Sequence, residues 1–186
     1  SHDDIGWGFA DEDAAAEGID GHSHRAYLTR LYTGETEGSW ARGVRFQHNP
    51  QTLDARLCGT TAALAGLEQA MLNADAAAID VAIRRIVLLY GVVIATPGSP
   101  LLNLGDELGT LNDTSYLYDR QLRADSRWIQ RPRFDWDRAT RRLDPETIEG
   151  RIYTAIAHML RTRVHIKDFA AGSAYRPRGR AGWPPW

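Results

Sequence analysis

The amino-acid sequence predicts an α/β fold with parallel strands, and it predicts that this fold is incomplete. Two observations lead to this expectation. A helix, a buried strand, a long polar loop and a second helix follow one another along residues 79–161, which is the order found in parallel α/β proteins. Only one complete strand and the end of another can be identified, and these are too few to close a sheet.

Two helices are expected before the strand. In residues 60–72, Thr60 can cap the first turn, and Leu64, Leu67 and Met71 recur on one face. A second helix extends to about residue 95, where Pro97 and the glycine after it stop it. Its apolar face repeats at helical spacing and consists of Ile79, Ile83, Ile86, Val87, Tyr90 and Ile94.

The strand and the elements after it are expected at residues 100–161. Residues 100–104 (PLLNL) are short and apolar and lie between glycines, which predicts a buried strand. Residues 105–135 form a loop too long for an ordinary connection, and such loops are usually functional. The last helix is expected at residues 144–161, with Asp144 as its cap and isoleucines facing inward.

The chain divides into four parts by composition. Residues 1–9 are expected to be the end of a strand that runs into a loop. Residues 10–56 are polar and irregular, with one helix at about 23–31, as in an inserted surface subdomain. Residues 57–165 hold the main helices, the strand and the long loop, and residues 166–186 form an irregular tail rich in Gly, Arg and Pro.

Charge and cysteine content exclude several classes of protein. The chain has 24 acidic and 22 basic residues, so its net charge of -2 gives no reason to expect a nucleic-acid or membrane partner. Its single cysteine, Cys58, excludes an internal disulfide and is expected to be a buried, inert thiol. No apolar run reaches membrane-spanning length and no signal peptide is visible, so we expect a cytoplasmic protein whose chain begins within a longer gene.

Three polar clusters at expected strand ends or loops carry possible chemistry. Residues 2–4 (His-Asp-Asp) precede Trp7, a combination suited to binding hydroxyls and stacking on a sugar ring. Residues 105–107 (Gly-Asp-Glu) follow the buried strand, where active sites of α/β proteins lie. Residues 112–131 mix Asp, Asn, aromatics and Arg127. Taken singly, the three also fit a solvated loop, a capped turn and a salt-bridged surface.

Together the three clusters resemble the last third of the catalytic domain of the α-amylase family of glycoside hydrolases. The segment HDD is similar to the family's motif after the seventh barrel strand, and GSPLLNLGDE is similar to its eighth-strand motif. Within the family, the resemblance is to amylosucrases and the similar sucrose hydrolases, and it extends from Ser1 to about Arg163, with Asn103 where an aromatic residue is usual. Four further segments carry it: HDDIGWGFADEDAA, ARGVRFQHNP, GTLND and DSRWIQRPRFDW.

The resemblance implies an incomplete (β/α)8 TIM barrel. Residues 1–9 would end the seventh strand, and residues 10–56 would form a subdomain over the active site. Asp3 would stabilise the transition state by holding the hydroxyls at C2 and C3 of the glucosyl ring, and His2 would donate to the same hydroxyls. Arg127 would close the floor of the glucose pocket.

Three more residues would bind substrate by the same resemblance. Asp4 and Arg56 would face the fructosyl or acceptor side, and Arg25 would lie near the acceptor path. For Arg25 and Arg56 a surface ion pair is an equally good interpretation.

The resemblance implies a retaining enzyme that transfers glucose from sucrose to an α-1,4-glucan and releases fructose. It assigns the nucleophile, in a Gly-x-Arg-x-Asp context, and the acid/base to earlier strands, and this pattern is absent from the sequence. We therefore expect this chain alone to be inactive. No cofactor and no metal are expected, and the partners would be sucrose and the glucan acceptor. A sucrose hydrolase and a non-catalytic sugar-binding remnant are the alternatives.

Overall fold

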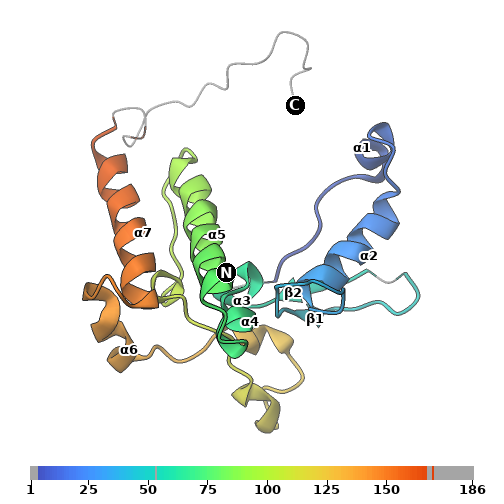
Figure 1. The fold of residues 1–186 in the computed structure, drawn as a ribbon. Helices are drawn as coiled ribbons and strands as arrows, with labels where there is room; N and C mark the ends of the chain where they lie inside the picture. Colours follow the sequence, from blue (N-terminus) through green and yellow to red (C-terminus); the bar gives the residue numbers. More distant parts are fainter. Residues whose placement is uncertain (1–3, 53, 167–168, 170–186) are drawn as a thin grey trace.

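In the computed structural model, helical elements lie on both sides of a short sheet, and the structure describes residues 4–52, 54–166 and 169 (Figure 1). Helices α1 and α2 and strands β1 and β2 span Asp11–Ala16, Gly21–Tyr32, Val44–Phe46 and Arg56–Cys58. Helices α3 to α7 span Thr61–Ala65, Leu67–Leu72, Ala76–Ala95, Trp136–Thr140 and Ile148–Val164. The helix predicted at residues 23–31 is confirmed as α2.

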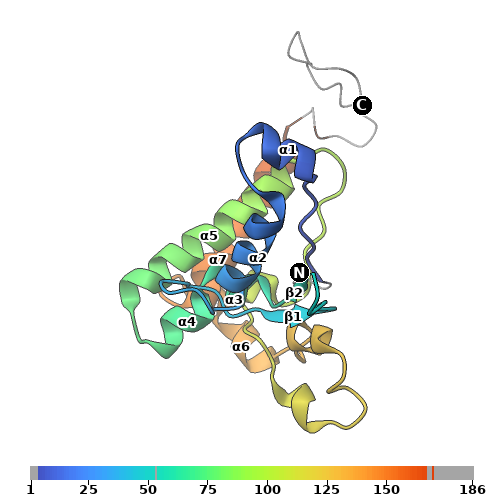
Figure 2. The same ribbon diagram turned by 90° about the vertical axis from the view of Figure 1, so that its right-hand side faces the viewer.

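The main core lies between helices α5 and α7, which run side by side in Figure 1, while in the turned view of Figure 2 α5 lies in front of α7. Both helices have apolar residues at helical spacing, so each turns one apolar face to the other. The buried side chains of this interface include Ile83, Ile86, Tyr90 and Ile94 of α5 and Ile152 and Ile156 of α7. Full burial of such a side chain contributes about 1.5–3 kcal/mol, so this interface is a major source of stability. The predicted inward face of α5 is confirmed.

The single helix predicted at residues 60–72 is wrong, because the chain breaks into α3 and α4 at Gly66. Gly66 has a φ of 102°, a left-handed conformation that glycine adopts without a steric cost. The side chains of Trp40 and Arg85 also lie within 3.2 Å of the position that a Cβ would take there. Met71, which was predicted to share one face with Leu64 and Leu67, is 38% exposed, whereas Leu64 and Leu67 are 8% and 0% exposed.

The buried strand predicted at residues 100–104 is also wrong. This segment has no regular secondary structure, and Leu101 and Leu104 are 84% and 68% exposed. A strand needs a neighbour for its main-chain hydrogen bonds, and no described residue pairs with this segment as a strand. Its side chains lie near a further exposed apolar surface on α5, formed by Leu88, Leu89, Val92 and Val93.

The sheet that does form is antiparallel and lies outside the predicted strand. Strand β1 pairs with β2, and Ile5 forms an additional antiparallel bridge with Leu57, with both main-chain bonds at 2.8 Å. Within residues 1–9, predicted to end a strand, the described residues 4–9 contribute one bridged position, Ile5, and residues 1–3 lie outside the described part of the chain. The described residues contain no parallel strand pair, and the incomplete barrel stays a prediction.

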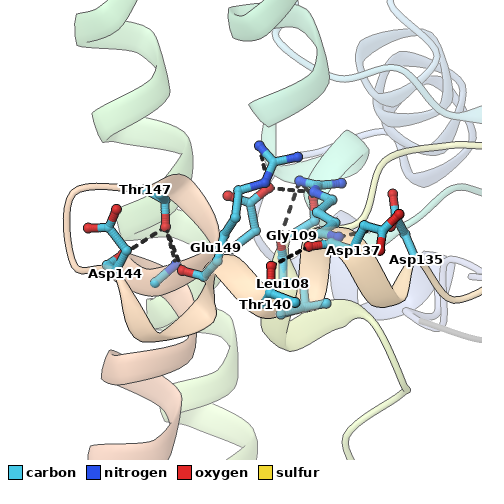
Figure 3. A network of polar contacts seen from close by, with 11 residues as sticks. Leu108, Gly109, Asp135, Asp137, Thr140, Asp144, Thr147 and Glu149 are labelled. Carbon is cyan, nitrogen blue, oxygen red and sulfur yellow. Dashed lines mark hydrogen bonds and ion pairs between the residues drawn. The ribbon is translucent and has the colours of Figure 1, made fainter.

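The predicted long loop is followed by a cluster of polar contacts that attaches it to α7 (Figure 3). Short 3-10 helices η1, η2 and η3 lie within the loop, at Asp106–Leu108, Ser115–Tyr118 and Ser126–Gln130. Arg138 of α6 donates to Glu149 at 2.5 Å and to the main-chain carbonyls of Leu108 and Gly109 at 3.3 and 3.1 Å. The guanidinium thus connects the loop with the first turn of α7.

Helix α7 begins later than predicted. Asp144 was expected to cap it, but the first helical residue is Ile148 and the cap is Thr147, whose hydroxyl accepts from the N–H of Gly150 at 3.0 Å. Figure 3 shows Asp144 in the turn before the helix, where its carbonyl accepts from the Thr147 hydroxyl at 2.7 Å. At the other end of the core, Arg163 of α7 donates to carbonyls that follow α5, including that of Thr96 at 3.0 Å.

Candidate functional site

A hollow of about 750 Å³ lies between the N-terminal segment, helix α2 and the start of strand β2. Its lining comes from three parts of the chain: Asp4 with residues 6–9, Arg25 of α2, and Gln47 with residues 54–56. The Ile5–Leu57 bridge brings the first and third parts together, although they are about fifty residues apart in the sequence. Asp4, Arg25 and Arg56, all predicted from the sequence to bind substrate, line this hollow.

Asp4 and Arg56 form an ion pair at its edge. Arg56 Nη1 donates to Asp4 Oδ2 at 2.8 Å, and the Asp4 side chain is 8% exposed whereas that of Arg56 is 56% exposed. A guanidinium has five N–H donors in a rigid plane, so one bond to Asp4 leaves others facing the solvent. The pair therefore holds a cationic hydrogen-bond donor in place at the edge of the hollow.

Arg25 is also held by acidic side chains. Its Nη1 donates to Asp11 Oδ1 at 2.7 Å, its Nε lies 3.8 Å from Asp54 Oδ1, and its guanidinium lies 5.5 Å from the centre of the Phe9 ring. The hydrogen bond to Asp11 raises the pKa of Arg25 above its ordinary value. The ion pairs that the sequence left open for Arg25 and Arg56 are thus present, and both guanidinium groups still line the hollow.

Aromatic rings supply the apolar part of the lining. Trp7 and Phe9 both line the hollow and are partly buried. The indole N–H of Trp7 donates to the Thr29 hydroxyl at 3.0 Å, and its ring lies 5.7 Å from that of Tyr32. These contacts fix the orientation of Trp7, so its ring can act as a preorganised surface.

Gln47 is a lining residue that the sequence analysis missed. Its φ of 50° lies in the left-handed region, which is uncommon for residues other than glycine. Such strained positions are often found at binding sites. The Asn-Pro pair at residues 49–50 marks a turn just after it, and this was the available sequence signal.

Arg127 lies outside the lining of the hollow. Its Nε and Nη2 donate to Asp125 at 3.0 and 2.9 Å, and its guanidinium lies 4.8 Å from the centre of the Phe46 ring. These hydrogen bonds hold the pKa of Asp125 below its ordinary value. Phe46 is in strand β1 and pairs with Arg56 of strand β2. Arg127 therefore lies beside the two-stranded sheet, at the end that carries Arg56. The remaining predicted residues, His2 and Asp3, lie outside the described residues.

Cys58 is confirmed as a buried thiol. Its side chain is fully buried beside Tyr116 and Ile129, and burial is the main cause that raises its pKa to about 11. The carboxylates of Asp4 and Asp125 act in the same direction. The group is therefore a neutral thiol at pH 7 and is not a nucleophile.

The raised pKa of Cys58 predicts a loss of stability at alkaline pH. The folded chain binds the thiol proton more tightly than the unfolded chain does, so the contribution is complete below pH 9 and is lost as the pH rises toward 11. Two pKa units correspond to about 2–3 kcal/mol. Urea denaturation from pH 8 to 11 should show this fall, and Cys58→Ala should show a smaller one. Equal falls in both proteins would contradict the assignment.

The lining of the hollow is mixed in chemical character. It combines two arginines, two carboxylates and two aromatic rings, a set that can hydrogen-bond polar groups and stack on a ring.

In the part of the chain that the structure describes, no three His, Cys, Asp or Glu side chains lie close enough together to hold a metal ion. No helix among the described residues has the length and apolar character needed to cross a membrane. A scan of the sequence against models of known protein families found no match.

Proposed function

We propose that this chain forms part of the substrate pocket of a retaining glucosyltransferase that transfers glucose from sucrose to an α-1,4-glucan and releases fructose. The observation that carries the proposal is the convergence of Asp4, Arg25 and Arg56 on one hollow. The resemblance to amylosucrases had named these three residues as substrate-binding, from separate positions along the sequence.

The size and lining of the hollow fit a sugar. Small-molecule sites measure about 300–1,000 Å³, so a hollow of about 750 Å³ has room for a disaccharide. Sucrose is uncharged and rich in hydroxyl groups, which can donate to the carboxylates and accept from the guanidinium groups. The rings of Trp7 and Phe9 can cover the apolar face of a sugar ring.

The described residues of the hollow support binding better than catalysis. Retaining transfer needs a nucleophile and an acid/base whose carboxyl groups are about 5 Å apart. The two carboxylates that line the hollow each lie beside an arginine: Asp4 beside Arg56 at 2.8 Å and Asp54 beside Arg25 at 3.8 Å. A carboxylate held in an ion pair is suited to accept hydrogen bonds from a bound sugar. This favours a second candidate function, sugar binding without turnover. A sucrose hydrolase would use the same pocket with water as acceptor, and its products would distinguish it.

Binding of sucrose to the 186-residue chain tests the proposal. Arg56→Ala should weaken binding about tenfold in isothermal titration, because hydroxyls lose a charged donor. The matched control is Arg42→Ala, since Arg42 also pairs with one carboxylate, Glu68 at 3.1 Å, but does not line the hollow. Release of fructose by the chain alone is expected to be undetectable. Sucrose binding that is equal in the two variants would contradict the proposal.

A further inference from the structure

A second cavity lies between the two-stranded sheet, the end of helix α2, and helices α3 and α5. Its volume is about 420 Å³, within the range of about 300–1,000 Å³ that small-molecule sites occupy. Three aromatic residues, Trp7, Tyr32 and Trp40, form part of its lining, and most of the other lining residues are aliphatic. Among the described residues, only Trp7 lines both this cavity and the hollow that contains Arg25. The cavity is therefore an apolar neighbour of the first site and not a part of it.

Arg85 of α5 is the one charged residue among the described residues that line this cavity. Its guanidinium lies 4.2 Å from the centre of the Trp40 ring, and its Nη1 donates to the main-chain carbonyl of Ala65 at 3.3 Å. Gly66 leaves room for this arrangement, because a Cβ there would lie 3.2 Å from Nη1 and 3.0 Å from Cδ1 of Trp40. The guanidinium is thus held against a ring that also lines the cavity.

Arg85 has hydrogen-bond donors that no described residue satisfies. Its bond to Ala65 uses Nη1, whereas Nε and Nη2 have no partner in the described part of the chain, and no described carboxylate forms an ion pair with Arg85. Among the described residues, the buried side-chain atoms without a partner are Nε of Arg45 and Nε2 of Gln130, so the two Arg85 nitrogens are accessible. The side chain therefore presents a positive charge and accessible N–H groups at an apolar cavity.

We propose that this cavity binds a small molecule in which a flat aromatic ring carries one carboxylate. Nε and Nη2 form one edge of the planar guanidinium, and the two oxygens of a carboxylate can accept from both in parallel. The ring of the ligand would pack against the aromatic and aliphatic lining.

Other classes of ligand fit this lining less well. A cation would be repelled by Arg85, and a sugar would press its hydroxyl groups against aliphatic side chains. An inorganic anion could take the same two hydrogen bonds, but it would leave the apolar lining uncovered. The proposal does not rest on the transfer reaction.

Titration of the 186-residue chain with naphthoate, followed by the side-chain N–H signals in two-dimensional NMR, tests this site. Saturable shifts are expected for Nε–H of Arg85 and for the indole N–H of Trp40. Naphthamide has the same ring without the charge, and it should bind about tenfold more weakly because a charge-assisted pair of hydrogen bonds is lost. Sucrose in the first hollow would instead move the signal of Arg25 Nε–H, so the two proposals can succeed or fail separately. Equal affinity for the two naphthyl compounds, or no saturable shift at Arg85 and Trp40, would overturn the proposal.

A pair of variants identifies the group that binds the carboxylate. Arg85→Gln should weaken naphthoate binding about tenfold and leave naphthamide binding unchanged, since only the charged ligand uses the guanidinium. The matched control is Arg84→Gln, because Arg84 is the neighbouring arginine, is exposed and does not line the cavity. Equal naphthoate affinity in the two variants would refute the site. Should Arg85→Gln fail to fold, the comparison of naphthoate with naphthamide on the unaltered chain still decides.

Discussion

Replacing Arg138 with methionine is expected to lower the free energy of unfolding by about 3–5 kcal/mol, because it leaves a charged carboxylate buried without its main partner. Glu149 is 5% exposed, and its Oε1 accepts a hydrogen bond from Nε of Arg138 at 2.5 Å. Its other cation, Arg141, is 4.0 Å away and largely exposed. The variant also removes the donor for the carbonyls of Leu108 and Gly109 (Figure 3). Urea denaturation measures the difference.

Two control variants distinguish the effect of a buried unpaired charge from the loss of an ion pair as such. Arg151→Met removes an exposed ion pair, that with Asp80 at 2.8 Å, and should cost no more than about 1 kcal/mol. The double variant Arg138→Met with Glu149→Met leaves no buried charge at this position and should recover much of the lost stability. If Arg138→Met costs no more than Arg151→Met, the buried Arg138–Glu149 pair contributes no more to stability than an exposed ion pair does.

Periodicity predicted the core because helix packing depends on residues that are close in sequence. The repeat from Ile79 to Ile94 is such a local pattern, and the face it predicted is buried against α7. A strand depends on a distant partner, which a run of apolar residues does not reveal. Residues 100–104 have the composition of a buried strand, but no described residue pairs with them. Gly66 was missed for a related reason, since its break involves Trp40 and Arg85, both about twenty residues away or more.

The candidate site was predicted from the resemblance and not from spacing. Asp4 and Arg56 are 52 residues apart, and nothing local to either indicates that they form an ion pair. Arg127 was named by the same resemblance; it does not line the hollow and donates to Asp125 at 2.9 Å, and its role in a glucose pocket stays a prediction. Gln130 was not predicted at all. Its Nε2 is buried and has no hydrogen-bond partner among the described residues, a property of the tertiary structure that no local sequence pattern reveals.

Gly150→Ala is expected to destabilise the chain by about 3 kcal/mol or more, although alanine usually favours a helix over glycine. Gly150 lies in the first turn of α7, and a Cβ there would overlap the main-chain carbonyl of Asp144 and approach the Thr147 hydroxyl within 3.0 Å. The carbonyl belongs to the turn that caps the helix, so relief of the overlap must displace that turn and the Thr147 cap together.

Gly91→Ala supplies the control with the opposite expected sign. Gly91 lies inside α5, and its added Cβ would meet only the Met159 sulfur at 3.5 Å, an ordinary contact. This variant should therefore gain about 0.5–1 kcal/mol from the better helix former. Thermal and urea denaturation of both variants measure the contrast. A stabilised Gly150→Ala protein would mean that the turn at residues 144–147 is looser than the structure shows, because only a displaced Asp144 carbonyl leaves room for the methyl group.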